Sequence, residues 1–221
     1  MADFARYLPL SQGPRADERG VTSDRRAPTA AVLREIAGAL RAGGDIGWNA
    51  PTDDGGTAAT TVTRLIAGFG RPPSRRALDS AQRVLGMQLG SSAAAPAPSG
   101  ATDAAAALET RAVLLSERRQ PTPLVELDDA VVAAILVGDA LGVRPALPPI
   151  ATGAVALRRA AAAPTPIKAV IAGHSLHATD AGWTIGHGPT LVGTAHELIR
   201  FLAGIGSEAP RRAREGEVGD G

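Results

Sequence analysis

Residues 130–141 read Ala-Val-Val-Ala-Ala-Ile-Leu-Val-Gly-Asp-Ala-Leu, and this stretch decides the fold class. Its side chains are apolar on nearly every side of a helix, and Asp139 is its only charged residue. A helix of that kind lies in the middle of a bundle, because it has no polar face to turn toward water. Asp128 or Asp129 is expected to act as its N-cap. The stretch therefore predicts a helical bundle with this helix at its centre.

Five further helices are expected around it, because each shows an apolar stripe bounded by a cap or a helix breaker. In the first of them, the glycines that follow Ala42 are expected to end the helix, and Thr57 is a good N-cap for the second. Residues 90–101, rich in Ala, Pro and Ser, are expected to form a flexible linker. The five expected helices span residues 28–42, 57–69, 74–89, 102–119 and 152–163.

The pattern changes after Pro166, where short β-prone runs alternate with glycine-containing turns. Thr194-Ala-His-Glu197 is a capping box, which predicts a last helix that ends at Gly204. The residues from 205 onward are charged and show no core pattern. The order therefore predicts a small antiparallel sheet with one packed helix, and an α+β fold overall. The expected strands are residues 167–171, 175–179, 183–185 and 190–192.

Composition excludes several classes of function. The 221 residues carry 23 basic and 22 acidic side chains, a balance that argues against a nucleic-acid partner. The basic residues are almost all arginine and 45 residues are alanine, a bias typical of high-GC bacterial genomes. Without cysteine, the chain has no disulfide, thiolate ligand or cysteine nucleophile. With no signal peptide or membrane-spanning run, we expect a cytoplasmic protein without a membrane partner.

Several motifs occur in the order found in one known family. Trp48-Asn-Ala-Pro51-Thr52 and the helix at 62–68 resemble a "W-x-x-P-T" loop and the helix that follows it. Residues 127–142 are similar to an "E-x-x-V-H-G-x-D-L" helix, and residues 176–204 to a "D-x-G-x-W" hairpin with a "G-x-A-x-x-L" helix. Together they resemble the mycothiol-dependent maleylpyruvate isomerase family over about residues 40 to 204.

The resemblance implies a domain organisation. It implies a DinB-like four-helix bundle over residues 27–164 and a sterol-carrier-like α/β domain over residues 165–206. A flexible arm, residues 1–26, is expected before the bundle, and a flexible tail, residues 207–221, after the second domain.

Family members hold a divalent metal and use the thiol mycothiol, but the ligand positions of the family are apolar here. The first histidine of the family falls on Leu65, and its Glu and second His fall on Ala133 and Val137. None of the three can donate a lone pair to a metal. A shifted register does not restore the site, because all four histidines lie after residue 170. We therefore expect neither a metal nor another cofactor.

Three residues are candidates for a ligand site: Trp48, Arg64 and Asp139. Asp139 either positions a ligand or pairs with an arginine, and the ion pair is the preferred interpretation. Trp48 is expected to fill the core beside the first helix, and Arg64 to be solvated, more than to contact a ligand. His174 and His177 fall on opposite faces of a strand, and His196 is expected to be exposed, so no new metal site is predicted.

The leading functional interpretation is a family relative that has lost its metal chemistry and binds a small molecule, or acts in regulation, between bundle and tail. One alternative is an active mycothiol-dependent isomerase or transferase with a divalent metal. The other is a structural module that binds a protein partner which the sequence does not identify. Outside the resemblance, no nucleophile-elbow serine, phosphate-binding glycine loop or paired carboxylate indicates an enzyme.

Overall fold

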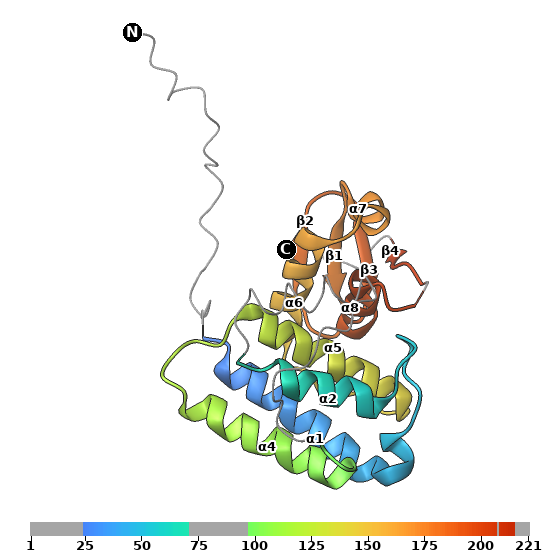
Figure 1. Ribbon diagram of the computed structural model, residues 1–221. Coiled ribbons are helices and arrows are strands. Elements are labelled where there is room, and N and C mark those ends of the chain that lie inside the picture. The colour runs from blue at the N-terminus through green and yellow to red at the C-terminus, as the bar shows by residue number, and fades with distance from the viewer. Residues whose placement is uncertain (1–23, 71–96, 207, 215–221) are drawn as a thin grey trace.

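The computed structural model describes residues 24–70, 97–206 and 208–214. In these residues seven helices and four strands form an α+β fold, as the sequence predicts. Figure 1 shows the helical bundle on one side, with the sheet and its packed helix on the other. The expected helix at 74–89 lies outside the described residues, as does most of the expected arm and linker.

Among the described residues four helices make up the bundle; the second confirms its predicted cap, and the first runs past its predicted end. Thr57 caps the second helix through a capping box with Thr60, as expected. The first helix runs beyond Gly43-Gly44, where it was expected to end. Gly44 leaves the helical conformation (φ 56°, ψ −155°), and the helix then resumes as far as Trp48. The bundle helices are α1 (Arg26–Trp48), α2 (Ala58–Gly68), α4 (Ala101–Glu117) and α5 (Leu124–Ala140).

Helix α5 is the buried central helix that residues 130–141 predict, but it starts earlier. Asp128 lies inside the helix instead of capping it, and Pro123 is the residue before the first turn. The Asp128 carboxylate pairs with Arg158 (Nε–Oδ2 3.2 Å) and Arg159 (Nε–Oδ1 2.5 Å) of helix α6 (Pro149–Ala162). The prediction that Asp128 caps the helix is therefore wrong. An aspartate suits a helix N-terminus, but here two arginines of α6 bind its carboxylate within the helix.

The C-terminal unit contains one helix where a strand was expected. Residues 167–171 belong to helix α7 (Thr165–Ile171), with Pro166 in its first turn. A proline suits the start of a helix, and a short apolar run does not by itself distinguish helix from strand.

The remaining three expected strands are present, and a fourth comes from the tail. The sheet order is β2-β1-β3-β4, with β1 parallel to β3 and the other pairs antiparallel, so the sheet is mixed and not purely antiparallel. The tail was expected to be flexible from residue 207, yet residues 211–212 pair with β3. The strands are β1 (Ser175–Ala178), β2 (Thr184–Gly186), β3 (Thr190–Gly193) and β4 (Arg211–Arg212).

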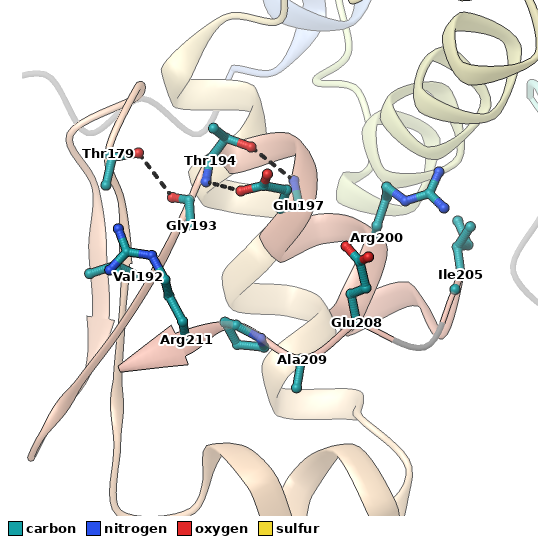
Figure 2. A pocket seen from close by; sticks show the side chains of 12 residues that line it. Thr179, Val192, Gly193, Thr194, Glu197, Arg200, Ile205, Glu208, Ala209 and Arg211 are labelled. Carbon is teal, nitrogen blue, oxygen red and sulfur yellow. Dashed lines mark hydrogen bonds between the residues drawn. The ribbon is translucent and has the colours of Figure 1, made fainter. Parts of the chain in front are cut away.

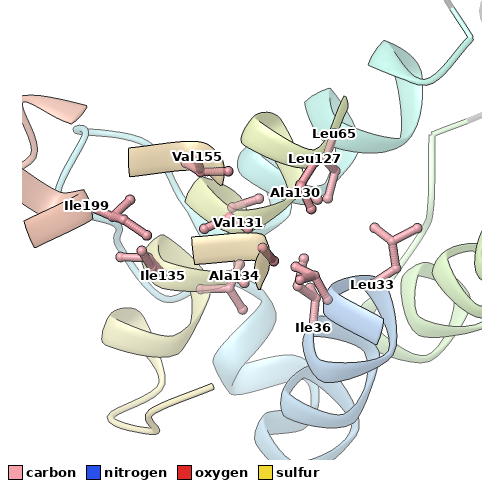
Figure 3. Packing of buried hydrophobic residues seen from close by; sticks show 14 of the residues in the cluster. Leu33, Ile36, Leu65, Leu127, Ala130, Val131, Ala134, Ile135, Val155 and Ile199 are labelled. Atoms are coloured by element: carbon pink, nitrogen blue, oxygen red, sulfur yellow. The ribbon is translucent and has the colours of Figure 1, made fainter. Parts of the chain in front are cut away.

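Helix α8 (Ala195–Ala203) joins the sheet to the bundle. Its capping box between Thr194 and Glu197 and its left-handed Gly204 (φ 70°) are both as predicted. Leu198 and Ile199 are fully buried and belong to the same hydrophobic cluster as the bundle residues Ile135 and Leu33. Figure 3 shows side chains from α1, α2, α5, α6 and α8 in this cluster. The bundle and the C-terminal unit therefore share one core.

Candidate functional site

Leu65, Ala133 and Val137, on which the resemblance places the ligand positions of the family, lie in the hydrophobic cluster. Leu65 is 5% exposed, Ala133 4% and Val137 0%, and α2, which carries Leu65, packs against α5. Figure 3 shows Leu65 among the apolar side chains of the cluster. Hydrocarbon side chains offer no donor atom to a divalent ion, so these residues do not fit the metal of the family. Across residues 24–70, 97–206 and 208–214 no group of three or more His, Asp or Glu side chains suits a metal.

The three candidate ligand residues from the sequence do not converge. Trp48 is 8% exposed and belongs to the core cluster. The side chain of Arg64 is 54% exposed and pairs with Asp54 (Nη1–Oδ2 3.4 Å) in the loop before α2. Asp139 lies near the end of α5 and contacts α8 instead of either residue. Trp48 therefore lies in the core, Arg64 is solvated and Asp139 pairs with an arginine, which are the interpretations that the sequence favoured for each residue.

Asp139 belongs to an ion-pair network that links the bundle to α8. Its Oδ2 accepts from Arg200 Nη1, and its Oδ1 lies 2.9 Å from His196 Nε2. Arg200 Nη2 also pairs with Asp53 Oδ2 at 2.6 Å, from the loop that joins α1 to α2. The guanidinium therefore bridges two aspartates that lie far apart in the sequence. These pairs raise the pKa of Arg200, with the Asp53 hydrogen bond as the largest cause.

The predicted environment of His196 is wrong. The second residue of α8 was expected to be exposed, but its side chain is 12% exposed and contacts Asp139. The helix packs against α5, and this packing turns the N-terminal turn of α8 toward the bundle. Sequence periodicity identifies the apolar face of a helix. It does not show whether another helix also packs over the residues at the edge of that face, as α5 does at His196.

A cavity of about 460 Å³ lies between β3, the start of α8 and the C-terminal segment that includes residues 208–211. Figure 2 shows β3 and α8 on one side of this cavity and the C-terminal segment on the other. Its lining combines an apolar part with hydroxyl, carboxylate and guanidinium groups. The lining residues are Thr179, Val192, Gly193, Thr194, Glu197, Arg200, Ile205, Gly206, Glu208, Ala209, Pro210 and Arg211.

Glu197 is held in a fixed position at the cavity. Its Oε2 accepts a hydrogen bond from the Thr194 backbone N–H at 2.8 Å, and the Thr194 hydroxyl accepts from the Glu197 N–H at 3.2 Å. The hydrogen bond from the Thr194 backbone lowers the pKa of Glu197 below its ordinary value. The carboxylate is therefore ionised at neutral pH, and its orientation is set by the helix cap.

Sequence reasoning missed this cavity because it placed residues 205 onward in a tail without structure. Ile205 is 9% exposed, and Arg211 pairs with Val192 across the β3–β4 ladder. A two-residue strand is too short to show an alternating pattern, so no periodic signal was present. The only local signal at the cavity was the capping box of Thr194 and Glu197.

The described geometry defines an α+β protein with one shared core, an apolar centre and a cavity in its C-terminal unit. Comparisons with protein-family models, with curated proteins and with solved structures found no match to the chain. Among the described residues, no helix is both long enough and apolar enough to span a bilayer.

Proposed function

We propose that this protein is a metal-free relative of the maleylpyruvate isomerase family that binds a small molecule in its C-terminal cavity. The main observation behind the proposal is that the bundle is filled with apolar side chains at the expected ligand positions, whereas the C-terminal unit contains a cavity. The positions of the family's metal ligands are filled by Leu65, Ala133 and Val137, whereas a cavity of about 460 Å³ lies beside α8.

The apolar ligand positions support the loss of metal chemistry. All three side chains belong to the hydrophobic cluster, so they contribute to stability through buried apolar area. Restoring a carboxylate at Ala133 would bury a charge in this cluster, which is costly without a partner. The proposed ligand binding therefore requires neither a metal nor mycothiol.

The size and lining of the cavity support small-molecule binding. Its volume falls within the range of about 300–1,000 Å³ that is common for ligand sites. Ala209 and Pro210 supply accessible apolar area above the buried Val192 and Ile205, while Thr179 and Glu197 supply polar groups. A few polar groups beside an apolar wall orient a ligand, which is the usual composition of such a site.

The proposal is tested with the full chain and two variants. Ala209→Trp places an indole in the cavity, and Ala106→Trp makes the same change at an exposed position of α4 as a control. Ligand-observed NMR with a panel of small amines, carboxylates and thiols is expected to detect binders of the wild type and of Ala106→Trp that Ala209→Trp no longer binds. Binding that both variants retain would place the ligand elsewhere and contradict the proposal.

The metal-free part has a separate test. Elemental analysis of the tag-free purified protein is expected to find zinc well below one equivalent per chain. Stoichiometric zinc, or mycothiol-dependent isomerase or transferase turnover with added divalent metal, would favour the active enzyme instead. A protein partner captured without any response to small molecules would favour the interaction module.

A further inference from the structure

We infer that the C-terminal cavity selects a cationic ligand, a primary amine or a related group attached to an apolar body. This inference rests on the proposed function, because it names the chemical class of the molecule bound at the same site. The evidence is the orientation of the carboxylates and guanidiniums that line the cavity, together with the hydrogen bonds and ion pairs that these groups already make.

Both guanidiniums that line the cavity are engaged with groups of the protein. Arg200 donates to Asp53 and Asp139, and Figure 2 shows its guanidinium on the side of the cavity away from Thr179. Arg211 Nη1 donates to the Arg212 carbonyl at 3.4 Å, and Figure 2 shows its guanidinium beside Val192 at the sheet. A ligand carboxylate would have to compete with two aspartates for Arg200, whereas the hydrogen bond of Arg211 to the neighbouring carbonyl is long.

The two carboxylates of the cavity are differently placed. Glu197 uses Oε2 for the helix cap, and the Thr194 side chain also interacts with this carboxyl, which leaves acceptor capacity on the carboxylate toward the cavity. Glu208 makes no hydrogen bond or ion pair with any described residue, and Figure 2 shows its side chain rising from the C-terminal segment toward α8. Both therefore offer acceptor oxygens to a donor inside the cavity.

The charge balance around the cavity points the same way. The lining itself carries two carboxylates and two guanidiniums, and the two aspartates that pair with Arg200 lie behind it, so that these six described residues together have an excess of two negative charges. Arg144 lies near enough to Glu197 to help lower its pKa, and including it leaves an excess of one. A cavity with a negative field attracts cations and repels anions. The carboxylates are Asp53, Asp139, Glu197 and Glu208, and the guanidiniums are Arg200 and Arg211.

The apolar part of the cavity determines the rest of the ligand. Val192 (1% exposed) and Ile205 (9% exposed) are buried beneath its wall, and the more exposed Ala209 and Pro210 supply the apolar surface that a ligand can contact. An amine that carries an aromatic or aliphatic body would place its ammonium between Glu197 and Glu208 and its body on this wall. No bond is formed or broken in this binding step.

The test compares three probes of similar shape: phenethylamine, 3-phenylpropionate and the neutral 3-phenylpropanamide. Their dissociation constants are measured by protein-observed NMR titration of the full chain at pH 7 and low salt. Attraction of the amine and repulsion of the carboxylate combine, so the amine is expected to bind about tenfold more tightly than the carboxylate.

Three charge-removing variants separate a local effect from a general one. Glu208→Gln, and Glu197→Gln with an amide oxygen that can still cap Thr194, are each expected to weaken amine binding by about threefold to fivefold. Glu117→Gln removes one negative charge from an exposed position near the end of α4 and is expected to leave the affinity unchanged.

The outcomes distinguish the inference from the function on which it rests. Equal or tighter binding of the carboxylate, in a cavity that Ala209→Trp blocks, overturns the cationic selectivity and leaves small-molecule binding intact. An effect of Glu117→Gln as large as that of Glu208→Gln also overturns the selectivity, because the site would then respond only to net charge. If none of the three probes binds and the panel of small molecules also fails, both the inference and the proposed function are wrong.

Discussion

Replacing Arg200 with glutamine is predicted to destabilise the protein through the ion-pair network that joins α8 to the bundle. The side chains of Arg200 and Asp139 are 23% and 26% exposed, so their charge-assisted hydrogen bond is only partly screened by solvent. Such a bond contributes about 1.5–3 kcal/mol. The Asp53 partner is 52% exposed, and its pair with Arg200 adds at most about 1 kcal/mol. The expected loss in free energy of unfolding is therefore about 1.5–4 kcal/mol.

Urea unfolding at pH 7 measures this loss, and the two tryptophans allow each part of the molecule to be followed. Trp48 is buried in the bundle, and Trp183 donates from Nε1 to Thr152 Oγ1 at 3.0 Å, between the hairpin and α6. Fluorescence of single-tryptophan variants shows whether the two parts unfold together, as a shared core predicts.

Arg64→Gln is the matched control, because Arg64 is also an arginine in an ion pair but its side chain is 54% exposed. Its expected effect is within about 0.5 kcal/mol of zero. A double-mutant cycle of Arg200→Gln with Asp139→Asn isolates the pair and is expected to give a coupling free energy of at least about 1 kcal/mol. If Arg200→Gln costs no more than Arg64→Gln, or if the two substitutions in the cycle are additive, the proposed role of the network is refuted.

Two further predictions concern the cap of α8. Thr194→Ala is expected to lower the free energy of unfolding in urea by about 1 kcal/mol, because it removes the hydroxyl that accepts from the Glu197 N–H. Thr194→Ser keeps a hydroxyl and is expected to retain most of this stability. Equal losses in both variants would contradict the capping role. The folded state lowers the pKa of Glu197 from its ordinary value of 4.5, so this carboxylate contributes stability above that pH and loses it as the pH falls through the folded-state value. Unfolding free energies measured across this range are expected to fall less steeply for Glu197→Gln than for the wild type, and parallel curves would show that the group does not titrate with folding.

The central helix and the helix caps are determined by local sequence. Residues 130–141 have no polar face, so burial on all sides is the only low-energy environment for that helix. Thr57 and Thr194 satisfy backbone N–H groups within three residues of themselves, so neither cap depends on a distant part of the chain. The α+β fold class follows from these features together with the turn-rich C-terminal sequence.

The apolar side chains that the resemblance aligns with metal ligands are also visible in the sequence, although their place in the core is not. Leu65 lies in α2, and Ala133 and Val137 in α5, and only the packing of these helices brings all three into one cluster. Asp139 was an isolated charge in the sequence, and the fold supplies both Arg200 and His196 as its partners.

Tertiary structure alone decided the partly buried position of His196 and the cavity. Each depends on pairing between segments whose own patterns are too short or too weakly periodic to specify it. The two residues of β4 become a strand because β3 offers an edge to them, and this pairing makes the preceding segment a wall of the cavity. Local sequence thus determined which residues form helices and caps, while the site depends on long-range contacts that no short stretch encodes.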